Sequence, residues 1–206
     1  WENLLLIKKV FTKTEAVNGF QQLLKFIHAE DEHMDTGILG ARVLFHVLSE
    51  FGYSNLAYRM ITRTDFPSYG NWIVRGATSL WEEFQPENAV VTSRNHHFFG
   101  DVSHWMIKQI AGIRYNPSGS DGAKAVIHPH FIDALTFAQA SHETPHGKLN
   151  VYWVRRNDEI FFFIRKPHNI MLMLELDAGY TFLNGRREYE VKEDTFECRV
   201  LISNRN

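Results

Sequence analysis

The segment Asn116-Pro117-Ser118-Gly119-Ser120-Asp121-Gly122 separates two parts of the chain that have different hydrophobic periods. Proline, glycine, serine and asparagine favour turns, so this segment is predicted to be a linker. Before it, apolar residues recur at the spacing of a helix, and after it they alternate as in a strand. The sequence therefore predicts a mixed chain, with a helical domain at residues 1–118 and a β-sandwich at residues 124–206.

Four helices are predicted before the linker, from apolar residues that fall on one face at helical spacing. They cover residues 14–29, 38–51, 55–61 and 98–113. Thr14 is expected to cap the first of them, and Gly52 to end the second. The stretch from Thr62 to Asn95 remains as a long loop. Loops of this length inside a compact domain are usually functional, so we expect the chemistry there.

Short strands are predicted after the linker. Leu149, Val151 and Trp153 alternate with polar neighbours, whereas the continuous apolar run 160–164 suits a strand buried on both faces. The predicted strands are 134–140, 149–153, 160–164, 169–176, 180–183, 187–191 and 195–202. Asn184-Gly185 is a strong hairpin signal. Many short strands separated by turns predict a β-sandwich.

Charge and composition exclude several classes of partner. The chain has 206 residues, with 22 Lys and Arg against 24 Asp and Glu, and a formal charge of −2. Such a balance gives no strong field to hold nucleic acid or an anionic membrane surface. The longest apolar runs fall far short of the roughly 20 residues that a membrane span needs. We expect a soluble protein with neither partner. The single cysteine, Cys198, leaves cytoplasmic, periplasmic and secreted locations all compatible.

The loop between Phe66 and Phe99 concentrates aromatic, carboxylate and imidazole side chains. Aromatic faces stack on the C–H faces of sugars and carboxylates bind hydroxyls, so this mixture is typical of a carbohydrate site. The alternative is that Trp72 and Trp81 are core anchors and that the adjacent glutamates form a solvated edge. Because neighbouring residues on a helix or strand point in different directions, we expect at most one of Glu82 and Glu83 to face a given pocket.

Four motifs occur in a fixed order in the helical part. They are Thr36-Gly37-Ile38-Leu39-Gly40, Phe66-Pro67-Ser68-Tyr69-Gly70, Gly76-Ala77-Thr78-Ser79-Leu80-Trp81-Glu82 and Asn95-His96-His97-Phe98-Phe99-Gly100. Together they resemble the α-L-rhamnosidases of glycoside hydrolase family 78. The resemblance implies an incomplete α/α toroid of the six-hairpin glycosidase type, followed by an antiparallel β-sandwich. It also implies an inverting hydrolase that removes terminal α-L-rhamnose from glycosides or polysaccharides.

The same resemblance suggests roles for individual residues. Glu82 matches the general base that activates water. Trp81 belongs to the same motif, and His96 matches a histidine that contacts the sugar. Trp72 and Asn95, from the same loop, complete the candidate substrate-binding set.

Two positions depart from the family pattern. Glu83 stands where the family usually has arginine, and His97 where it usually has tyrosine. These departures leave the base assignment intact and bear on the substrate preference.

The family's general acid lies in a motif of the form Asp-x-Pro-x-Arg-x-x-Arg. The nearest match, Asp65-Phe66-Pro67, is followed by Ser68 and Tyr69 with no arginine at the required place. The chain also begins at Trp1 without methionine. We therefore expect the acid to lie in a missing N-terminal part of the same enzyme, and the chain alone to be inactive on rhamnosides.

The eleven histidines raise the question of a metal site. His128 and His130 form one close pair, and His96 and His97 form another. Neither an HExxH pattern nor an EF-hand loop accompanies them. We expect no metal and no other cofactor.

An alternative function comes from a different class, a non-catalytic carbohydrate-binding or interaction module. In that case Tyr152, Trp153 and the run Phe161–Phe163 would form a sugar platform on the sandwich. Trp153 is in phase with Leu149 and Val151, however, which favours a place in the core.

Overall fold

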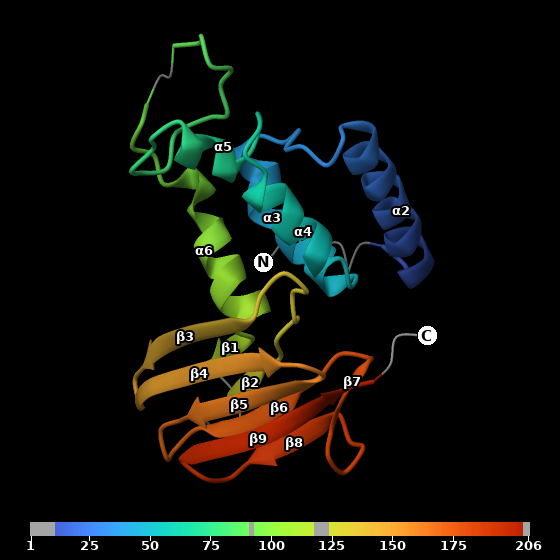
Figure 1. The fold of residues 1–206 in the computed structure, drawn as a ribbon, viewed down its shortest axis with the longest axis vertical. Helices are drawn as coiled ribbons and strands as arrows, with labels where there is room; N and C mark the ends of the chain where they lie inside the picture. The colour runs from blue at the N-terminus through green and yellow to red at the C-terminus, as the bar shows by residue number, and fades with distance from the viewer. Residues whose placement is uncertain (1–10, 91–92, 118–123, 204–206) are drawn as a thin grey trace. The chain divides into compact units, whose positions relative to one another are not determined.

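A computed structural model describes residues 11–90, 93–117 and 124–203 of the chain. The chain divides into two compact units, Trp1–Ser103 and His104–Asn206. The first holds helices and the second mainly strands (Figure 1), which confirms the predicted order of the two classes. The domain bounds at residues 118 and 124 stay a prediction, and residues 118–122 of the predicted linker lie outside the described residues.

The helices of the first unit agree with the predicted ones, with one addition. They are α2 (Lys13–Ala29), α3 (Ile38–Glu50), α4 (Ser54–Thr62) and α5 (Tyr69–Val74). The sequence missed α5 because six residues are too few for a helical period to stand out. The predicted N-cap of α2 was wrong by two positions. Thr12 is the cap, and its backbone N–H donates to the Glu15 carboxylate at 2.7 Å in a capping box.

Apolar faces of α3 and α4 form the core of the first unit. Phe45 and Leu48 of α3, and Ala57 and Met60 of α4, are almost fully buried. Phe20 of α2 stacks on a phenylalanine that follows α3, with 4.0 Å between the ring centroids. These contacts place the N-terminus of α3 and the C-terminus of α4, the two ends that matter for the site below.

The fourth predicted helix, residues 98–113, is present with three hydrogen-bonding patterns. A 3₁₀ turn (Phe98–Gly100) precedes α6 (Asp101–Trp105), and a π-helical turn (Met106–Ile110) follows it. The division between the two units falls within α6. The helix ends before Gly112, whose φ of +86° is easily adopted only by glycine.

The second unit contains two sheets, and the predicted antiparallel β-sandwich is confirmed apart from one parallel strand pair. One sheet has the order β1-β2-β6-β8 and the other β3-β4-β5-β9-β7. All neighbours are antiparallel except β2 and β6, which are parallel. The strands are β1 (Ile113–Asn116), β2 (Lys124–Ile127), β3 (Phe137–Thr144), β4 (Gly147–Arg156), β5 (Glu159–Arg165), β6 (Met171–Glu175), β7 (Tyr180–Phe182), β8 (Glu188–Val191) and β9 (Thr195–Ile202). Of these, β1 and β2 were not predicted.

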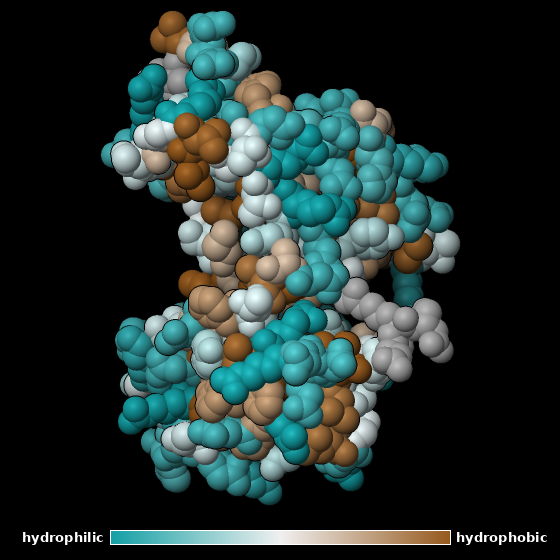
Figure 2. Space-filling model, in the orientation of Figure 1, coloured by the Kyte–Doolittle hydropathy of each residue, from teal (hydrophilic) through white to brown (hydrophobic). Residues whose placement is uncertain are grey.

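The core of the sandwich follows the period of two along β4 and β5. Trp153 is fully buried, and its indole N–H donates to the Ile110 carbonyl at 2.9 Å, so the prediction that it fills the core is confirmed. The prediction that residues 160–164 are buried on both faces was wrong. Ile160 and Phe162 face the core, whereas Phe163 points outward and is 39% exposed. Figure 2 accordingly shows hydrophobic patches between hydrophilic side chains on the outer face of the five-stranded sheet.

Two further sequence expectations can be compared with the structure. The Asn184-Gly185 turn is present, with the Gly185 N–H donating to the Phe182 carbonyl at 2.9 Å. It does not close a hairpin, because β7 and β8 on either side of it belong to different sheets. Within the described ranges, no helix is both long and apolar enough to span a membrane.

Candidate active site

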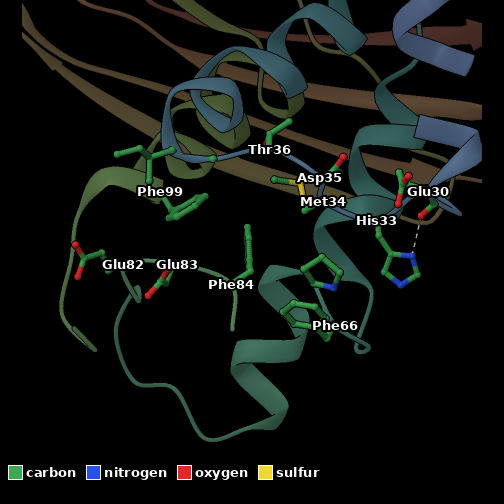
Figure 3. A pocket seen from close by; sticks show the side chains of 13 residues that line it. Glu30, His33, Met34, Asp35, Thr36, Phe66, Glu82, Glu83, Phe84 and Phe99 are labelled. Carbon is green, nitrogen blue, oxygen red and sulfur yellow. Dashed lines mark hydrogen bonds between the residues drawn. The ribbon is translucent and has the colours of Figure 1, made fainter. Parts of the chain in front are cut away.

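A cavity of about 840 Å³ lies in the first unit, between the N-terminus of α3 and the chain that follows α5. Carboxylates line it together with aromatic rings (Figure 3). The acidic residues are Glu30, Asp35, Glu82 and Glu83, and the aromatic ones are Phe66, Phe84 and Phe99. In Figure 3, Glu82 and Glu83 lie at one end and Glu30 and His33 at the other, with Phe84 between them.

The helix α5 is joined closely to the end of α4. Ser68 caps α5: its hydroxyl oxygen accepts from the Asn71 N–H at 3.0 Å and lies 2.6 Å from the Arg63 carbonyl. Gly70 makes the approach possible, because a Cβ built there would lie only 2.1 Å from that same carbonyl oxygen. The motif Phe66–Gly70 thus sets where α5 begins and where the following loop departs.

An aromatic cluster anchors the loop that carries the glutamates. Trp72 of α5 stacks on Phe84 with 4.4 Å between ring centroids, and both contact Phe99. The Tyr69 hydroxyl donates to the Phe99 carbonyl at 3.0 Å. Burial and the nearby Asp101 charge raise the pKa of Tyr69 above its usual range, so this hydroxyl keeps its proton and remains a donor. The cluster holds the loop against α5.

Two backbone hydrogen bonds join the end of the motif Gly76–Glu82 to the segment 93–96. The Glu82 N–H donates to the Ser93 carbonyl at 3.0 Å, and the His96 N–H donates to the Leu80 carbonyl at 2.8 Å. The residues around Glu82 are therefore held on one side by the aromatic cluster and on the other by the segment 93–96.

Both adjacent glutamates line the cavity. The expectation that at most one of Glu82 and Glu83 faces a given pocket was therefore wrong. It assumed the fixed side-chain directions of a helix or strand, whereas this segment is an irregular bend in which successive side chains are not bound to opposite faces.

Trp72 and Trp81 lie in the protein interior, 3% and 4% exposed. Their ring centroids are 6.0 Å apart, and the guanidinium carbons of Arg75 and Arg94 lie 5.0 and 5.3 Å from the Trp81 ring. Neither tryptophan is among the described residues that line the cavity. This placement agrees with the core-anchor alternative, and the predicted contact with substrate stays a prediction.

His96 is half-buried and Asn95 is exposed. The His96 ring lies edge-on against Phe98, with 4.0 Å between centroids, and is parallel to the His97 ring. Among the residues given a position, the cavity lining includes neither His96 nor Asn95. The structure thus brings Glu82 to the cavity, and the roles of all five candidates, Glu82 included, remain predictions.

The far end of the cavity was not anticipated from the sequence. The His33 Nδ1–H donates to the Glu30 carbonyl at 3.0 Å, and His33 Nε2 lies 3.1 Å from an oxygen of Asp65. Hydrogen bonds from Arg63 hold the pKa of Asp65 well below its usual range, so that carboxylate stays charged. The only signal in the sequence was the polar run between the first two helices, which includes Asp35.

Two protein families match the chain. One is described as the bacterial alpha-L-rhamnosidase 6 hairpin glycosidase domain and matches residues 4–110. The other is the bacterial alpha-L-rhamnosidase C-terminal domain, which matches residues 112–182. The predicted resemblance and the predicted fold class, a six-hairpin glycosidase region followed by a β-rich domain, are both confirmed.

Curated relatives are much longer than this chain. An alpha-L-rhamnosidase of Streptomyces avermitilis is 34% identical in an alignment of 166 residues that covers 77% of this chain and 16% of that protein. One from Alteromonas sp. is 32% identical in an alignment of 169 residues that covers 78% of this chain and 18% of that protein. The chain therefore spans less than a fifth of the length of these two relatives.

Solved structures show the same fold. An alpha-L-rhamnosidase from Dictyoglumus thermophilum superposes with a TM-score of 0.82 at 24% identity, over 95% of this chain and 24% of that chain. The Streptomyces avermitilis alpha-L-rhamnosidase, solved in complex with L-rhamnose, superposes with a TM-score of 0.74 at 29% identity. That match covers 89% of this chain and 19% of the Streptomyces chain.

Proposed function

The chain belongs to the bacterial α-L-rhamnosidase family, and on that premise we propose that it is part of an enzyme that hydrolyses terminal α-L-rhamnosides with inversion. The observation that carries the proposal is the position of Glu82. It ends the motif Gly76–Glu82 and lies on the wall of a cavity lined by carboxylates and aromatic rings. A sugar ring needs both kinds of group, one for its hydroxyls and one for its C–H face.

In this proposal Glu82 is the general base. An inverting glycosidase uses one carboxylate to activate a water on the face of the sugar opposite the leaving group, and a carboxylic acid to protonate that group. The two carboxyl groups stand roughly 6.5–9.5 Å apart to leave room for the water. The two backbone hydrogen bonds that join residues 80–82 to 93–96 support the base role, because they limit movement of Glu82 relative to bound sugar.

The relatives support the proposed substrate class. The Streptomyces avermitilis relative is solved with L-rhamnose, which supports a rhamnose-containing carbohydrate as the substrate here. Trp72 and Trp81 are proposed to act mainly by positioning, since both are buried beside the segment that carries Glu82. His96 and Asn95 are not among the described residues that line the cavity, but we propose that they also contact the substrate.

The general acid is proposed to come from a part of the enzyme outside residues 1–206. The relatives are several times longer than this chain, and the family's acidic motif does not occur in it. We expect the 206-residue chain alone to leave 4-nitrophenyl α-L-rhamnoside intact. Ready turnover by the chain alone would contradict this and would direct attention to Asp35 or Glu30 as the acid.

The base assignment is tested in the longest in-frame protein that contains this chain. Glu82→Gln keeps the shape of the side chain but removes its basicity, so kcat is expected to fall by about 10²- to 10⁴-fold with little change in KM. Glu83→Gln is the matched control, since it makes the same change one residue away on the same cavity wall. Proton NMR of the first product reports the anomeric configuration. Equal losses in the two variants, or a retained configuration, would contradict the proposal.

A further inference from the structure

The parallel pair β2 and β6 brings together polar side chains that are far apart in the sequence. The register places Ile127 beside Leu174 at the carboxyl ends of the two strands, an offset of 47 residues. Parallel strands end at the same edge of a sheet, so the residues that follow them remain neighbours. The same offset pairs His128 with Glu175 and His130 with Asp177, and both pairs are in contact.

The side chains converge on the Asp177 carboxylate. One of its oxygens lies 2.8 Å from His128 Nε2, and the other lies 2.6 Å from His130 Nδ1. The nitrogen and oxygen atoms that the three residues offer all lie within 4.8 Å of one another. The His130 side chain is 9% exposed, His128 is 20% exposed and Asp177 is 35% exposed. The group is therefore largely withdrawn from water but open at the carboxylate.

The backbone that carries the two histidines is fixed independently of their side chains. The His128 N–H donates to the Gly112 carbonyl at 2.9 Å, and the His130 N–H donates to the Gln109 carbonyl at 2.7 Å. Gly112 has no Cβ, and one built there would lie 2.5 Å from the Pro129 nitrogen. This close contact holds His128 and His130 in place before any ligand arrives.

We propose that His128, His130 and Asp177 bind a divalent transition-metal ion, with Zn²⁺ as the best fit. Two imidazoles and one carboxylate are a common donor set for Zn²⁺, which binds them at about 2.0–2.2 Å. Tetrahedral geometry at those bond lengths separates the donor atoms by about 3.3 Å. The imidazole–carboxylate contacts of 2.6 and 2.8 Å thus need to open by about 0.7 and 0.5 Å, respectively. The exposed side of Asp177 leaves a fourth position for water.

The charged groups around the two histidines have opposite effects on metal binding: a carboxylate beside His128 favours it, and a guanidinium beside His130 opposes it. A Glu175 oxygen lies 3.5 Å from His128 Nδ1, on the far side of the ring from Asp177. A carboxylate in that place orients a metal-bound imidazole and adds a second negative charge against the ion. Behind His130, the Arg114 guanidinium lies 3.4 Å from Nε2. Its positive charge opposes a cation, so we expect moderate rather than very tight binding.

The test is a calorimetric titration of chelator-treated protein with ZnCl₂ alone. The wild-type chain is expected to bind one equivalent at this site. Asp177→Asn keeps the shape of the side chain but replaces one of its two acceptor oxygens by an NH₂ donor and removes the anionic ligand. The association constant is expected to fall by at least about tenfold. His130→Gln is expected to do the same.

His168→Gln is the matched control, because His168 is an exposed histidine that also contacts an aspartate, Asp194, at 3.2 Å. It is expected to leave the association constant unchanged. Near-UV circular dichroism of each variant checks that the sandwich is folded. Equal Zn²⁺ affinity in wild-type and Asp177→Asn proteins would overturn the proposal.

If the variants do not fold, a spectroscopic measurement on the wild-type protein tests whether the proposed site binds a metal ion. Co²⁺ in a four-coordinate site of imidazole and carboxylate ligands gives strong visible absorption, whereas six-coordinate aqueous Co²⁺ gives very weak absorption. Titration of the wild-type chain with CoCl₂ is expected to produce the strong bands and to saturate at one equivalent. A spectrum that stays that of aqueous Co²⁺ would overturn the proposal.

Discussion

Replacing Gly70 by alanine tests the reasoning about how α5 is positioned. The new Cβ would lie 2.1 Å from the Arg63 carbonyl oxygen and 2.9 Å from that of Thr62. Non-bonded heavy atoms attract at roughly 3.5 Å, so the first contact is too short by more than an ångström. Both obstacles are backbone atoms, which cannot turn aside as the end of a flexible side chain can.

The cost has two parts. Overpacking of this kind costs about 1–3 kcal/mol. If α5 moves away to relieve it, Ser68 also loses its 2.6 Å contact with the Arg63 carbonyl, at about 0.5–1.5 kcal/mol. Alanine gains up to about 1 kcal/mol of helix propensity over glycine, which offsets some of this. The net effect expected for Gly70→Ala is a loss of about 1–3 kcal/mol in the unfolding free energy of the first unit.

The matched control is Gly19→Ala in the middle of α2. Nothing lies within 4 Å of a Cβ built at Gly19, and the residue is exposed. The same chemical change should therefore stabilise the first unit there by up to about 1 kcal/mol. Urea unfolding followed by tryptophan fluorescence measures both, because Trp72 lies two residues after Gly70. A Gly70→Ala protein as stable as the wild type would refute the close approach of α5 to α4.

Three further predictions concern single side chains. Ser68→Ala removes the cap of α5 and should cost about 1–2 kcal/mol of unfolding free energy in urea, whereas a neutral result would contradict the capping role. The depressed pKa of Asp65 stabilises the folded state above the unfolded-state value of about 4, and this contribution is lost as pH falls below it. Thermal unfolding between pH 5 and pH 2 should thus be less pH-dependent for Asp65→Asn than for the wild type. Burial raises the pKa of Cys198 to about 12, so the folded protein should react with iodoacetamide at pH 8 much more slowly than the urea-unfolded chain, and equal rates would be inconsistent with its burial.

The sequence predicted those elements whose pattern is local and long enough to be repeated. The helix α2 and the strands β4 and β9 each contain several periods, and their predicted bounds agree with the structure to within a few residues. The short elements α5 and β2 were missed because they contain too little repetition to stand out, so that tertiary contacts decide them. The equally short β6 and β8 were predicted because turn residues mark where they begin or end.

The candidate site was only partly predictable for a different reason. Glu82 could be identified because it ends a motif with a recognisable order of residues. His33 and Asp35 contribute to the same cavity but carry no such signal, since nothing in the sequence says that the turn before α3 faces the loop after α5. The same holds for Asp177, which joins the two histidines only through the register of a parallel strand pair.

That parallel pair also has a consequence for the order in which the second unit folds. Strands β3, β4 and β5 are consecutive, and only two residues separate each from the next. Pairing β2 with β6 instead requires closing a loop of 47 residues, which carries a larger entropic cost. We therefore expect the β3–β4–β5 meander to be formed in the folding transition state and the edge with His130 and Asp177 to close afterwards. Substitutions at that edge should speed unfolding while leaving the folding rate almost unchanged.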